Sequence, residues 1–333
     1  MAATNSLIIQ TEKLSRSFGR VVAVDQLDLE IKTGEIFGLV GPDGAGKTTI
    51  IRLLAAIMNP TAGRARVAGY DTVKQAEAIK SHIGYMAQEF SLYGDLSVQE
   101  NMEFFADVFN VRGQDRRARI ERLLAFAGLT EFTGRRGAKL SGGMKKKLGL
   151  ACALVHQPDL LLLDEPTTGV DPVSRREFWD ILTNLRLQGT TILVSTPYMD
   201  EAERCSRVGL IYQGRLIVAD PPARIKQRVA GELIELRPVG ANHSIGLLRR
   251  AVAVLSPLPG VLEIQTYGDL LHLFVDRAAE RMPEIKVALA AHAIEAASLR
   301  QTQARMEEAF ISLIRRQGAG EAVAASLGGV SSA

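Results

Sequence analysis

The chain has 333 residues, of which 47% are hydrophobic, so it is long and apolar enough to form two domains with buried cores. Its formal net charge of +3 and its two cysteines, Cys152 and Cys205, argue against a nucleic-acid-binding surface, a disulfide framework and a cysteine metal site. No apolar run reaches the roughly 18 residues that a membrane-spanning helix needs, and residues 1–6 lack the apolar core of a secretory signal, so we expect any action on a membrane to require a partner.

Up to about residue 212, the chain alternates predicted strands and helices. Residues 7–32 are rich in β-formers and contain a turn at residues 17–20, which predicts antiparallel strands. An apolar strand at 36–40 leads into a glycine-rich loop, and helical apolar spacing follows over 48–58. Further short apolar strands are predicted at 83–87, 160–164, 191–195 and 208–212. This alternation favours an α/β fold with a parallel sheet covered on both faces.

Two segments depart from this alternation. From Gln88 to Ser141 the strand signal disappears, and apolar residues spaced i, i+3, i+4 over 98–109 and 116–127 predict a helical insertion at about 89–140. Beyond residue 227, strands are predicted at 232–237, 262–266, 270–275 and 297–301, with helices at 245–253 and 281–291. This order predicts a small ferredoxin-like α+β domain over 228–317, with a last helix at 304–316. Residues 318–333 predict a disordered tail.

The glycine-rich loop has the pattern of a phosphate-binding loop. Glycines allow backbone N–H groups to turn toward phosphate oxygens, and the N-terminus of the following helix adds positive potential. In this pattern Lys47 contacts the β- and γ-phosphates, and the Thr48 hydroxyl ligates Mg²⁺. An ordinary turn is the alternative, but a strand before the loop and a helix after it favour the phosphate site. The loop consists of Gly41, Pro42, Asp43, Gly44, Ala45, Gly46, Lys47, Thr48 and Thr49.

Two adjacent carboxylates follow a run of four leucines at 160–163. The run predicts a buried strand, and Asp164 and Glu165 then lie at its carboxyl end, where parallel sheets present ligand groups. Because Pro166 follows directly, a helix cap is the alternative. Together with a phosphate loop, the two carboxylates favour a nucleotide site that contains magnesium.

A third segment, residues 140–144, opens a helix predicted over 144–155 with Ser141, Gly142 and Gly143. A helix N-terminus of this composition is a second anion site. The lysines at 145–147 indicate a solvated helix face rather than a nucleic-acid patch. With these segments in this order, the chain resembles the ATP-binding subunits of ABC transporters over about residues 7–225. Its details resemble the multidrug-export branch that pairs with ABC-2 type permeases.

The resemblance implies an ABC-type P-loop NTPase fold over residues 7–227, with an antiparallel β subdomain and the helical insertion. It implies that Glu165 acts as the catalytic base, and that Ser141, Gly142 and Gly143 reach the γ-phosphate held by a second protomer. It implies that Gln88 and Lys47 take part in catalysis with Glu165, and that Gln88 touches Mg²⁺ or water. It also implies that Asp164 joins Thr48 in the Mg²⁺ shell, that Asp171 lies in the loop that couples the two sites, and that Phe18 stacks on adenine. A lone Phe in a β-rich segment also fits a core position.

Two residues depart from the family pattern. Met144 stands where glutamine is commoner, and we expect this change to leave the phosphate contacts intact. Pro197 stands where the family usually has a histidine that contacts the γ-phosphate, and proline has neither a donor side chain nor an N–H. Either the chain hydrolyses ATP without this histidine, with Glu165 as the base, or it binds ATP and pairs with a second, competent ATPase.

The function implied by the resemblance is ATP hydrolysis that powers export of a small, drug-like molecule through a separate membrane permease. The chain would act as a peripheral protein at the cytoplasmic face of the inner or plasma membrane, with a second ATPase protomer of the same or a paired kind. The alternatives are a catalytically degenerate regulatory subunit and a soluble ABC ATPase that acts outside transport. The single nucleotide domain and the near-neutral charge count against the last of these.

Overall fold

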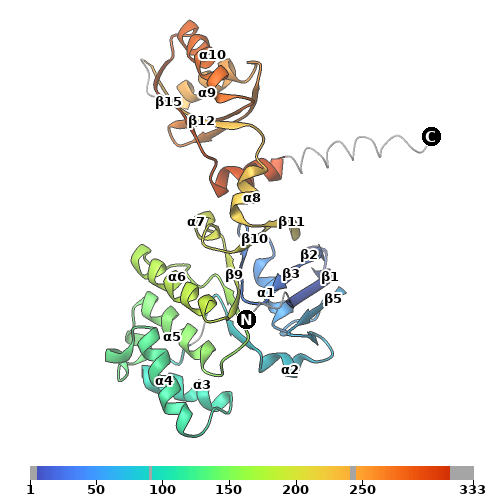
Figure 1. The fold of residues 1–333 in the computed structure, drawn as a ribbon, viewed down its shortest axis with the longest axis vertical. Coiled ribbons are helices and arrows are strands. Elements are labelled where there is room, and N and C mark those ends of the chain that lie inside the picture. Colours follow the sequence, from blue (N-terminus) through green and yellow to red (C-terminus); the bar gives the residue numbers. More distant parts are fainter. Residues whose placement is uncertain (1–5, 90–91, 241–244, 316–333) are drawn as a thin grey trace, which may run out of the picture. The chain divides into compact units, whose positions relative to one another are not determined.

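A computed structural model describes residues 6–89, 92–240 and 245–315 (Figure 1). The chain divides into two compact units, and the boundary between them in the sequence lies between Pro222 and Ala223. Unit 1 contains every sequence motif described above, and unit 2 contains the α+β segment. The tail expected at 318–333 lies outside the described residues.

The centre of unit 1, in the part that the structure describes, is a six-stranded sheet of order β11-β10-β4-β9-β8-β7. Its five neighbouring strands from β10 to β7 run parallel, and β11 pairs antiparallel at the edge. Every residue of β4 and β8 is buried, which explains their continuous apolar sequences. The strands are β4 (Ile36–Val40), β7 (Ile83–Met86), β8 (Leu160–Asp164), β9 (Thr191–Thr196), β10 (Arg207–Tyr212) and β11 (Arg215–Asp220).

A second sheet in unit 1 is antiparallel, as residues 7–32 predicted. Strand β1 (Leu7–Phe18) pairs with β2 (Val21–Leu27), β3 (Glu30–Lys32) and β5 (Ala62–Val67), and β5 pairs with β6 (Tyr70–Asp71). Strands β5 and β6 were not predicted.

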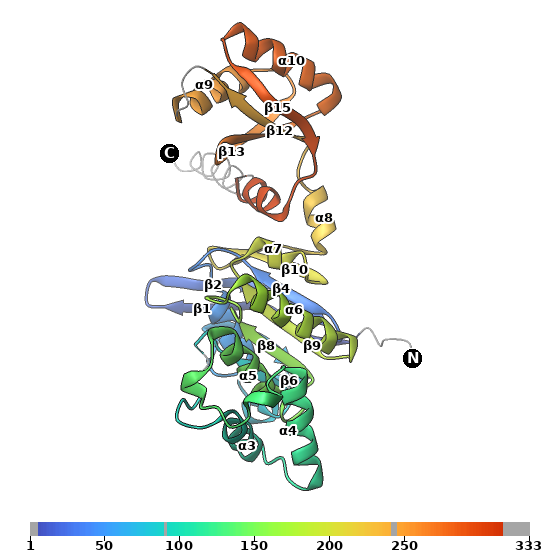
Figure 2. The same cartoon turned by 90° about the vertical axis from the view of Figure 1, so that its left-hand side faces the viewer.

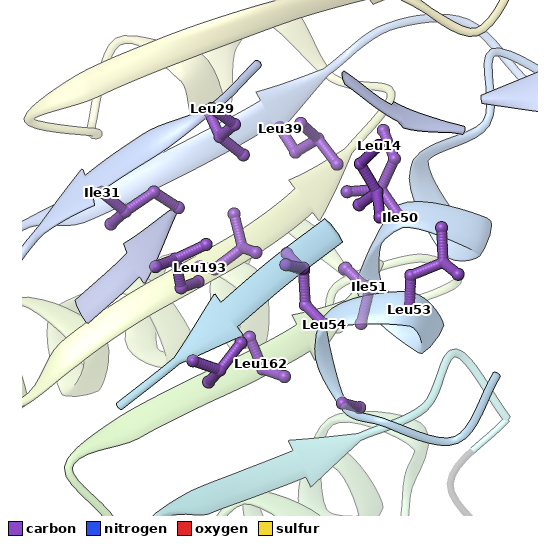
Figure 3. Packing of buried hydrophobic residues seen from close by; sticks show 14 of the residues in the cluster. Leu14, Leu29, Ile31, Leu39, Ile50, Ile51, Leu53, Leu54, Leu162 and Leu193 are labelled. Carbon is purple, nitrogen blue, oxygen red and sulfur yellow. The ribbon is translucent and has the colours of Figure 1, made fainter. Parts of the chain in front are cut away.

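Helix α1 (Lys47–Leu54) follows the glycine-rich loop and packs between the two sheets. It ends four residues before the predicted end, and Ala56 just beyond it has a φ of +55°, which no α-helix accommodates. Figure 3 shows the shared core: four residues of α1 meet side chains from both sheets. The labelled residues are Ile50, Ile51, Leu53 and Leu54 of the helix, Leu39, Leu162 and Leu193 of the parallel sheet, and Leu14, Leu29 and Ile31 of the antiparallel region. This core fixes the loop that precedes α1.

The predicted helical insertion forms a subdomain with its own apolar core. Helix α3 (Val98–Val108) begins with a capping box made by Ser97 and Glu100. Helix α4 (Gln114–Phe126) and helix α5 (Gly142–Leu154) pack against α3, with short 3₁₀ turns η1 (Thr130–Phe132) and η2 (Gly137–Lys139). Figure 1 shows this subdomain and the antiparallel sheet on different sides of unit 1. The other described helices of unit 1 are α2 (Ala76–Lys80), α6 (Pro172–Leu187) and α7 (Met199–Ala202), and α8 (Pro222–Gln227) crosses the boundary between the units.

Unit 2 has the β-α-β-β-α-β order predicted for a small α+β domain. Its described strands form an antiparallel sheet of order β13-β14-β12-β15. Helices α9 and α10 cover one face, and the helical residues 306–315 lie against the other, as Figure 2 shows. The elements are β12 (Glu232–Val239), α9 (Ile245–Leu255), β13 (Val261–Tyr267), β14 (Leu270–Val275), α10 (Ala278–Ala291) and β15 (Glu295–Thr302).

Candidate functional site

A cavity of about 610 Å³ opens in unit 1 beyond the carboxyl ends of β4, β8 and β9. This is the edge at which parallel α/β sheets bind ligands. Segments from five parts of the sequence meet there. The cavity is lined by Ala23, Asp43, Gly44, Gly46, Lys47, Thr48, Thr49, Gln88, Glu165, Thr168, Pro197 and Tyr198.

The glycine-rich loop wraps closely enough around its surroundings to require glycine at two positions. A Cβ at Gly41 would lie 2.1 Å from the carbonyl oxygen of Ile211, and one at Gly46 would lie 2.3 Å from that of Ala23. Gly46 also has a φ of +104°, a value that residues with a side chain rarely adopt. The loop therefore needs glycine at these two positions, and it lines the cavity at the N-terminus of α1, where a phosphate site offers backbone N–H groups.

Lys47 is buried, with 3% of its surface exposed, and its ammonium group contacts the beginning of the glycine-rich loop. Nζ donates hydrogen bonds to the carbonyl oxygens of Gly41 at 2.9 Å and Pro42 at 3.0 Å. The same Nζ lies 3.1 Å from Glu165 Oε1. Because an ammonium group carries three protons, the loop uses two of them and the third faces the cavity and Glu165.

Glu165 is held in an unusual backbone conformation by its neighbours. Its φ is +46°, which for a residue other than glycine costs about 1–3 kcal/mol and is maintained only by surrounding contacts. Its backbone N–H donates to Ser195 Oγ at 2.9 Å. Its carboxylate accepts hydrogen bonds from Gln88 Nε2 at 3.0 Å and Thr168 Oγ1 at 3.4 Å. The carboxylate is thereby fixed in the wall of the cavity.

Asp164 offers a buried oxygen atom that suits a cation. Oδ1 accepts hydrogen bonds from Thr48 Oγ1 at 3.1 Å and Ser195 Oγ at 2.7 Å. Oδ2 is buried with no hydrogen-bond partner among the described residues, which is costly unless something else pairs with it. Helix α6 begins at Pro172 with Asp171 as its N-cap, so neither Asp164 nor Glu165 caps that helix and the cap alternative is wrong.

The oxygen atoms of Asp164 and Thr48 fit Mg²⁺ in particular. The described residues contain no group of three or more His, Cys, Asp or Glu side chains that could enclose a metal ion. Mg²⁺ in phosphate-binding proteins is commonly held by one or two carboxylates together with phosphate oxygens and water. One buried carboxylate beside a hydroxyl and a phosphate-type loop matches that arrangement.

Lys146 of α5 connects the helical subdomain to Gln88, since its Nζ donates a hydrogen bond of 2.8 Å to the Gln88 carbonyl oxygen. Burial lowers the pKa of Lys146, while the charges of Asp164 and Glu165 act in the opposite direction. The neighbouring Lys147 pairs with Glu177 and is mostly buried. The interpretation of the lysine run as a solvated face is therefore wrong for two of its three members.

The remaining predicted site residues do not line this cavity in the part of the chain that the structure describes. Phe18 is 45% exposed, so the alternative of a core position is wrong, and the Arg16 guanidinium lies 4.7 Å from its ring centroid. Its stacking on adenine stays a prediction.

Two helix N-termini carry the other predicted residues. Ser141 caps α5, accepting a hydrogen bond from the Met144 N–H, and Asp171 caps α6, where hydrogen bonds from backbone N–H groups lower its pKa. A Cβ at Gly143 would lie 2.6 Å from Ser174, so the two N-termini are adjacent. Their roles toward a second protomer stay predictions.

Sequence reasoning missed Ser195, Thr168 and Tyr198 as site residues. Ser195 pairs with Asp164 in the register of β8 and β9, and it contacts both carboxylate residues. The sequence could have indicated Ser195, because this residue stands at the carboxyl end of the strand predicted at 191–195, where parallel sheets present ligand groups. Thr168 and Tyr198 carry no motif signal and are recognised only from their place in the cavity wall.

The sequence of the chain is similar to those of known ATP-binding proteins. Residues 24–168 match the family model described as ABC transporter. Over 307 residues the chain is 35% identical to the daunorubicin resistance ATP-binding protein DrrA3 of Streptomyces coeruleorubidus, covering 92% of this chain and 95% of DrrA3. This chain belongs to the family of ABC transporter ATP-binding proteins. The resemblance noted from its motifs is thereby confirmed.

A second relative is longer than this chain. The probable multidrug ABC transporter ATP-binding protein YbhF of Escherichia coli K12 is 42% identical over 328 residues, which cover 95% of this chain and 54% of YbhF. The chain thus spans about half the length of YbhF.

Solved structures agree with the predicted fold class. The dimeric structure of the ATP-binding cassette MJ0796 bound to ADP and Pi has a TM-score of 0.59 at 26% identity and covers 64% of this chain and 98% of that chain. A structure described as the ATP-binding subunit of an ABC transporter has a TM-score of 0.61 at 25% identity and covers 66% and 92%. The prediction of an ABC-type P-loop fold is confirmed.

Among the helices that the structure describes, none has the length and apolarity to cross a bilayer.

Proposed function

We propose that this chain binds and hydrolyses ATP, and that hydrolysis powers export of a small, drug-like molecule through a separate membrane permease. The observation that carries the proposal is the position of Glu165. Its carboxylate lies 3.1 Å from the phosphate-loop lysine and 3.0 Å from Gln88, in a cavity at the carboxyl ends of parallel strands. A carboxylate in this position can accept a proton from a water molecule next to a bound terminal phosphate.

The chemistry follows from the groups around the cavity. The backbone N–H groups of the loop and the third proton of Lys47 bind the β- and γ-phosphates. Asp164 and Thr48 hold Mg²⁺, which neutralises phosphate charge when bound. Gln88 orients the water molecule. The water oxygen attacks the γ-phosphorus, and a proton of the water molecule moves to Glu165. ADP leaves with the electron pair of the broken P–O bond.

A second protomer completes the site in this proposal. Ser141, Gly142 and Gly143 stand at the N-terminus of α5, outside the lining of their own chain's cavity. A helix N-terminus with exposed N–H groups binds anions, so it suits the γ-phosphate of another chain. The adjacent Asp171 would contact the same partner. The similar MJ0796 cassette is dimeric in its solved structure, which supports a homodimer or a paired arrangement here.

The transported substrate and the membrane partner are inferred from relatives. YbhF is named as a probable multidrug transporter protein and DrrA3 as a daunorubicin resistance protein. We therefore expect an ABC-2 type permease, with this chain bound as a peripheral subunit at the cytoplasmic face of the inner or plasma membrane.

The test is steady-state ATP hydrolysis by the purified chain with Mg²⁺, compared with Glu165→Gln. The substitution removes the base while keeping the hydrogen bonds from Gln88 and Thr168 available. We expect turnover in the wild type and a loss of at least about a hundredfold in the variant, with ATP binding retained. Glu177→Gln, an exposed carboxylate of α6, is the matched control and should hydrolyse ATP at the wild-type rate.

A second candidate function rests on Pro197, which lines the cavity where the family usually has histidine. In that case the chain binds ATP without hydrolysing it and pairs with a competent ATPase. Tight ATP binding by a wild-type chain that shows no turnover would establish this alternative and overturn the first.

A further inference from the structure

The loop after β9 forms one wall of the cavity and places two described residues in its lining, Pro197 and Tyr198. They line the cavity together with Lys47, Gln88 and Glu165. Proline has no donor, so it cannot contact a phosphate oxygen through a hydrogen bond. The Tyr198 phenol is half-buried, next in sequence, and carries an O–H donor.

We propose that Tyr198 donates a hydrogen bond to the terminal phosphate in the transition state of hydrolysis, and that Glu201 holds the loop that presents it. Tyr198 is thus a catalytic residue, and Glu201 is a positioning residue. This inference rests on the proposed ATPase function.

Arg175 of α6 restrains the tyrosine ring. Its guanidinium carbon lies 5.0 Å from the centroid of the Tyr198 ring, a cation–π distance. The guanidinium is itself fixed, since Nη2 donates to Asp200 Oδ2 at 2.9 Å and Nε lies 3.7 Å from Glu201 Oε1. Because these carboxylates engage Arg175 and it does not line the described cavity, the donor in this wall is the tyrosine and not the arginine.

Glu201 fixes the backbone of the loop after β9 by setting the direction in which the Thr196 hydroxyl group donates its hydrogen bond. Its side chain is 1% exposed, and Oε2 accepts a hydrogen bond of 2.7 Å from Thr196 Oγ1. A carboxylate accepts only, so the single hydroxyl proton of Thr196 must point to it. The lone pairs of the same oxygen then remain for the Tyr198 N–H, which donates at 3.0 Å. The carboxylate thereby determines where the backbone of Tyr198 lies.

The other oxygen of Glu201 reaches the loop that carries the catalytic base. Oε1 accepts a hydrogen bond of 2.7 Å from Thr167 Oγ1, two residues beyond Glu165. One buried carboxylate therefore connects the loop after β8 with the loop after β9. Tyr198 and Glu165, which both line the cavity, lie on these two connected loops.

The experiment compares wild type with Tyr198→Phe, which removes the hydroxyl and keeps the ring over Arg175. We expect kcat for ATP hydrolysis to fall at least about tenfold, in the range seen when one transition-state donor is lost. Affinity for vanadate in the presence of ADP should fall by the same factor, because vanadate with ADP mimics the transition state. Affinity for ADP alone should stay within about threefold, since the proposed bond goes to the terminal phosphate.

A double variant tests whether positions 197 and 198 serve the same phosphate. Introducing a donor at the neighbouring position, in Pro197→His with Tyr198→Phe, should recover most of the lost kcat. Tyr70→Phe is the matched control, a half-buried tyrosine that does not line the described cavity, and it should hydrolyse ATP like wild type.

Three results would overturn the inference while leaving the ATPase proposal standing. These are a Tyr198→Phe variant as fast as wild type, equal losses of kcat and ADP affinity, and a double variant no faster than the single one. A wild-type chain without turnover would overturn the proposed ATPase function and this inference together.

Discussion

Unit 1 and unit 2 both bury charged side chains, but they do so in different places. In unit 1, Lys47 and Glu165 are buried in the lining of the cavity at the carboxyl ends of the parallel strands, and Asp164 is buried at the end of β8. In unit 2, His272 of β14 lies beneath the helical residues 306–315, with its Nδ1 3.0 Å from Glu308 Oε1. Both of those side chains are at least 93% buried.

The difference lies in what each cluster leaves unpaired. In unit 1 the Asp164 Oδ2 atom has no hydrogen-bond partner among the described residues, and Lys47 pairs with Glu165 in the lining of a cavity that a ligand can fill. In unit 2 the imidazole of His272 is enclosed by protein, between Glu308, Glu235 and the stacked ring of Tyr267. Neither ring nitrogen has a hydrogen bond of good geometry within the described residues. Buried charge prepares a site for a ligand in unit 1 and attaches a helix to a sheet in unit 2.

The largest effect should come from removing the cation of unit 1. Lys47→Met deletes the phosphate contact and removes the ion-pair partner of the buried Glu165 carboxylate, so turnover should fall at least about a hundredfold. Breaking a buried ion pair on one side costs about 3–5 kcal/mol of stability, and we expect a loss in this range.

The measurement is urea unfolding followed by the fluorescence of Trp179. This residue is the only tryptophan in the sequence and is buried in α6, so its signal reports on unit 1 alone. Adding Glu165→Gln to Lys47→Met should restore much of the stability and none of the turnover. A double variant as unstable as the single one would show that the pair is not coupled.

A smaller effect should follow from the Glu308 carboxylate of unit 2. Burial alone would raise its pKa, but the contact with His272 and hydrogen bonds from the backbone N–H groups of Glu308 and Arg305 outweigh burial and lower it. Because the folded-state pKa is lowered, the stabilisation is present above the ordinary value of 4.5 and is lost as the pH falls below it.

Glu308→Gln should therefore destabilise unit 2 by about 1–3 kcal/mol at pH 7, and by less at pH 4. Far-UV circular dichroism follows both units in urea, and the unit 1 transition is identified from Trp179 fluorescence. Glu280→Gln, which breaks an exposed pair with Arg277, is the control and should change stability little at either pH. A Glu308→Gln effect that stays constant between pH 7 and pH 4 would contradict the assignment.

The sequence predicted most of the unit 1 site because its parts are contiguous motifs. The loop at 41–49 and the two residues after the leucine strand each form one short segment, and parallel strands bring such segments to one edge. The contacts of the site that the sequence did not predict join residues that are far apart in sequence. Lys146 and Gln88 are separated by 58 residues, and Ser195 and Asp164 by 31.

The missed fold elements have a similar physical cause. Strand β5 has the sequence AGRARV, in which two arginines interrupt the apolar residues, so it lacks the continuous apolar run that revealed β4 and β8. Strand β11 does contain four apolar residues in a row, at 216–219, but only Val218 of this edge strand is buried. In unit 2, β14 reads as an apolar strand, and its pattern predicted the strand correctly. Nothing in that pattern indicated that His272 would be buried opposite a glutamate 36 positions later, because that pairing depends on where residues 306–315 lie.

The smallest effect should come from the rim of the unit 2 cluster. Arg300 Nη2 lies 2.7 Å from Glu235 Oε1, but the arginine side chain is 68% exposed. Exposed partners contribute about 0–1 kcal/mol, and salt screens them. Arg300→Gln should therefore lower the free energy of unfolding of unit 2 by less than about 1 kcal/mol at low salt, and by less still in about 1 M NaCl.

Comparing the stability losses caused by Arg300→Gln and Glu308→Gln shows how far the buried cluster of unit 2 extends. Glu235 is 13% exposed and also lies 3.8 Å from His272 Nε2. If Arg300→Gln cost as much as Glu308→Gln in the same urea experiment, Glu235 would depend on the arginine for its charge balance. The buried cluster of unit 2 would then extend to the sheet edge at β15. A small, salt-sensitive loss keeps its centre at His272 and Glu308, beneath the helical residues 306–315.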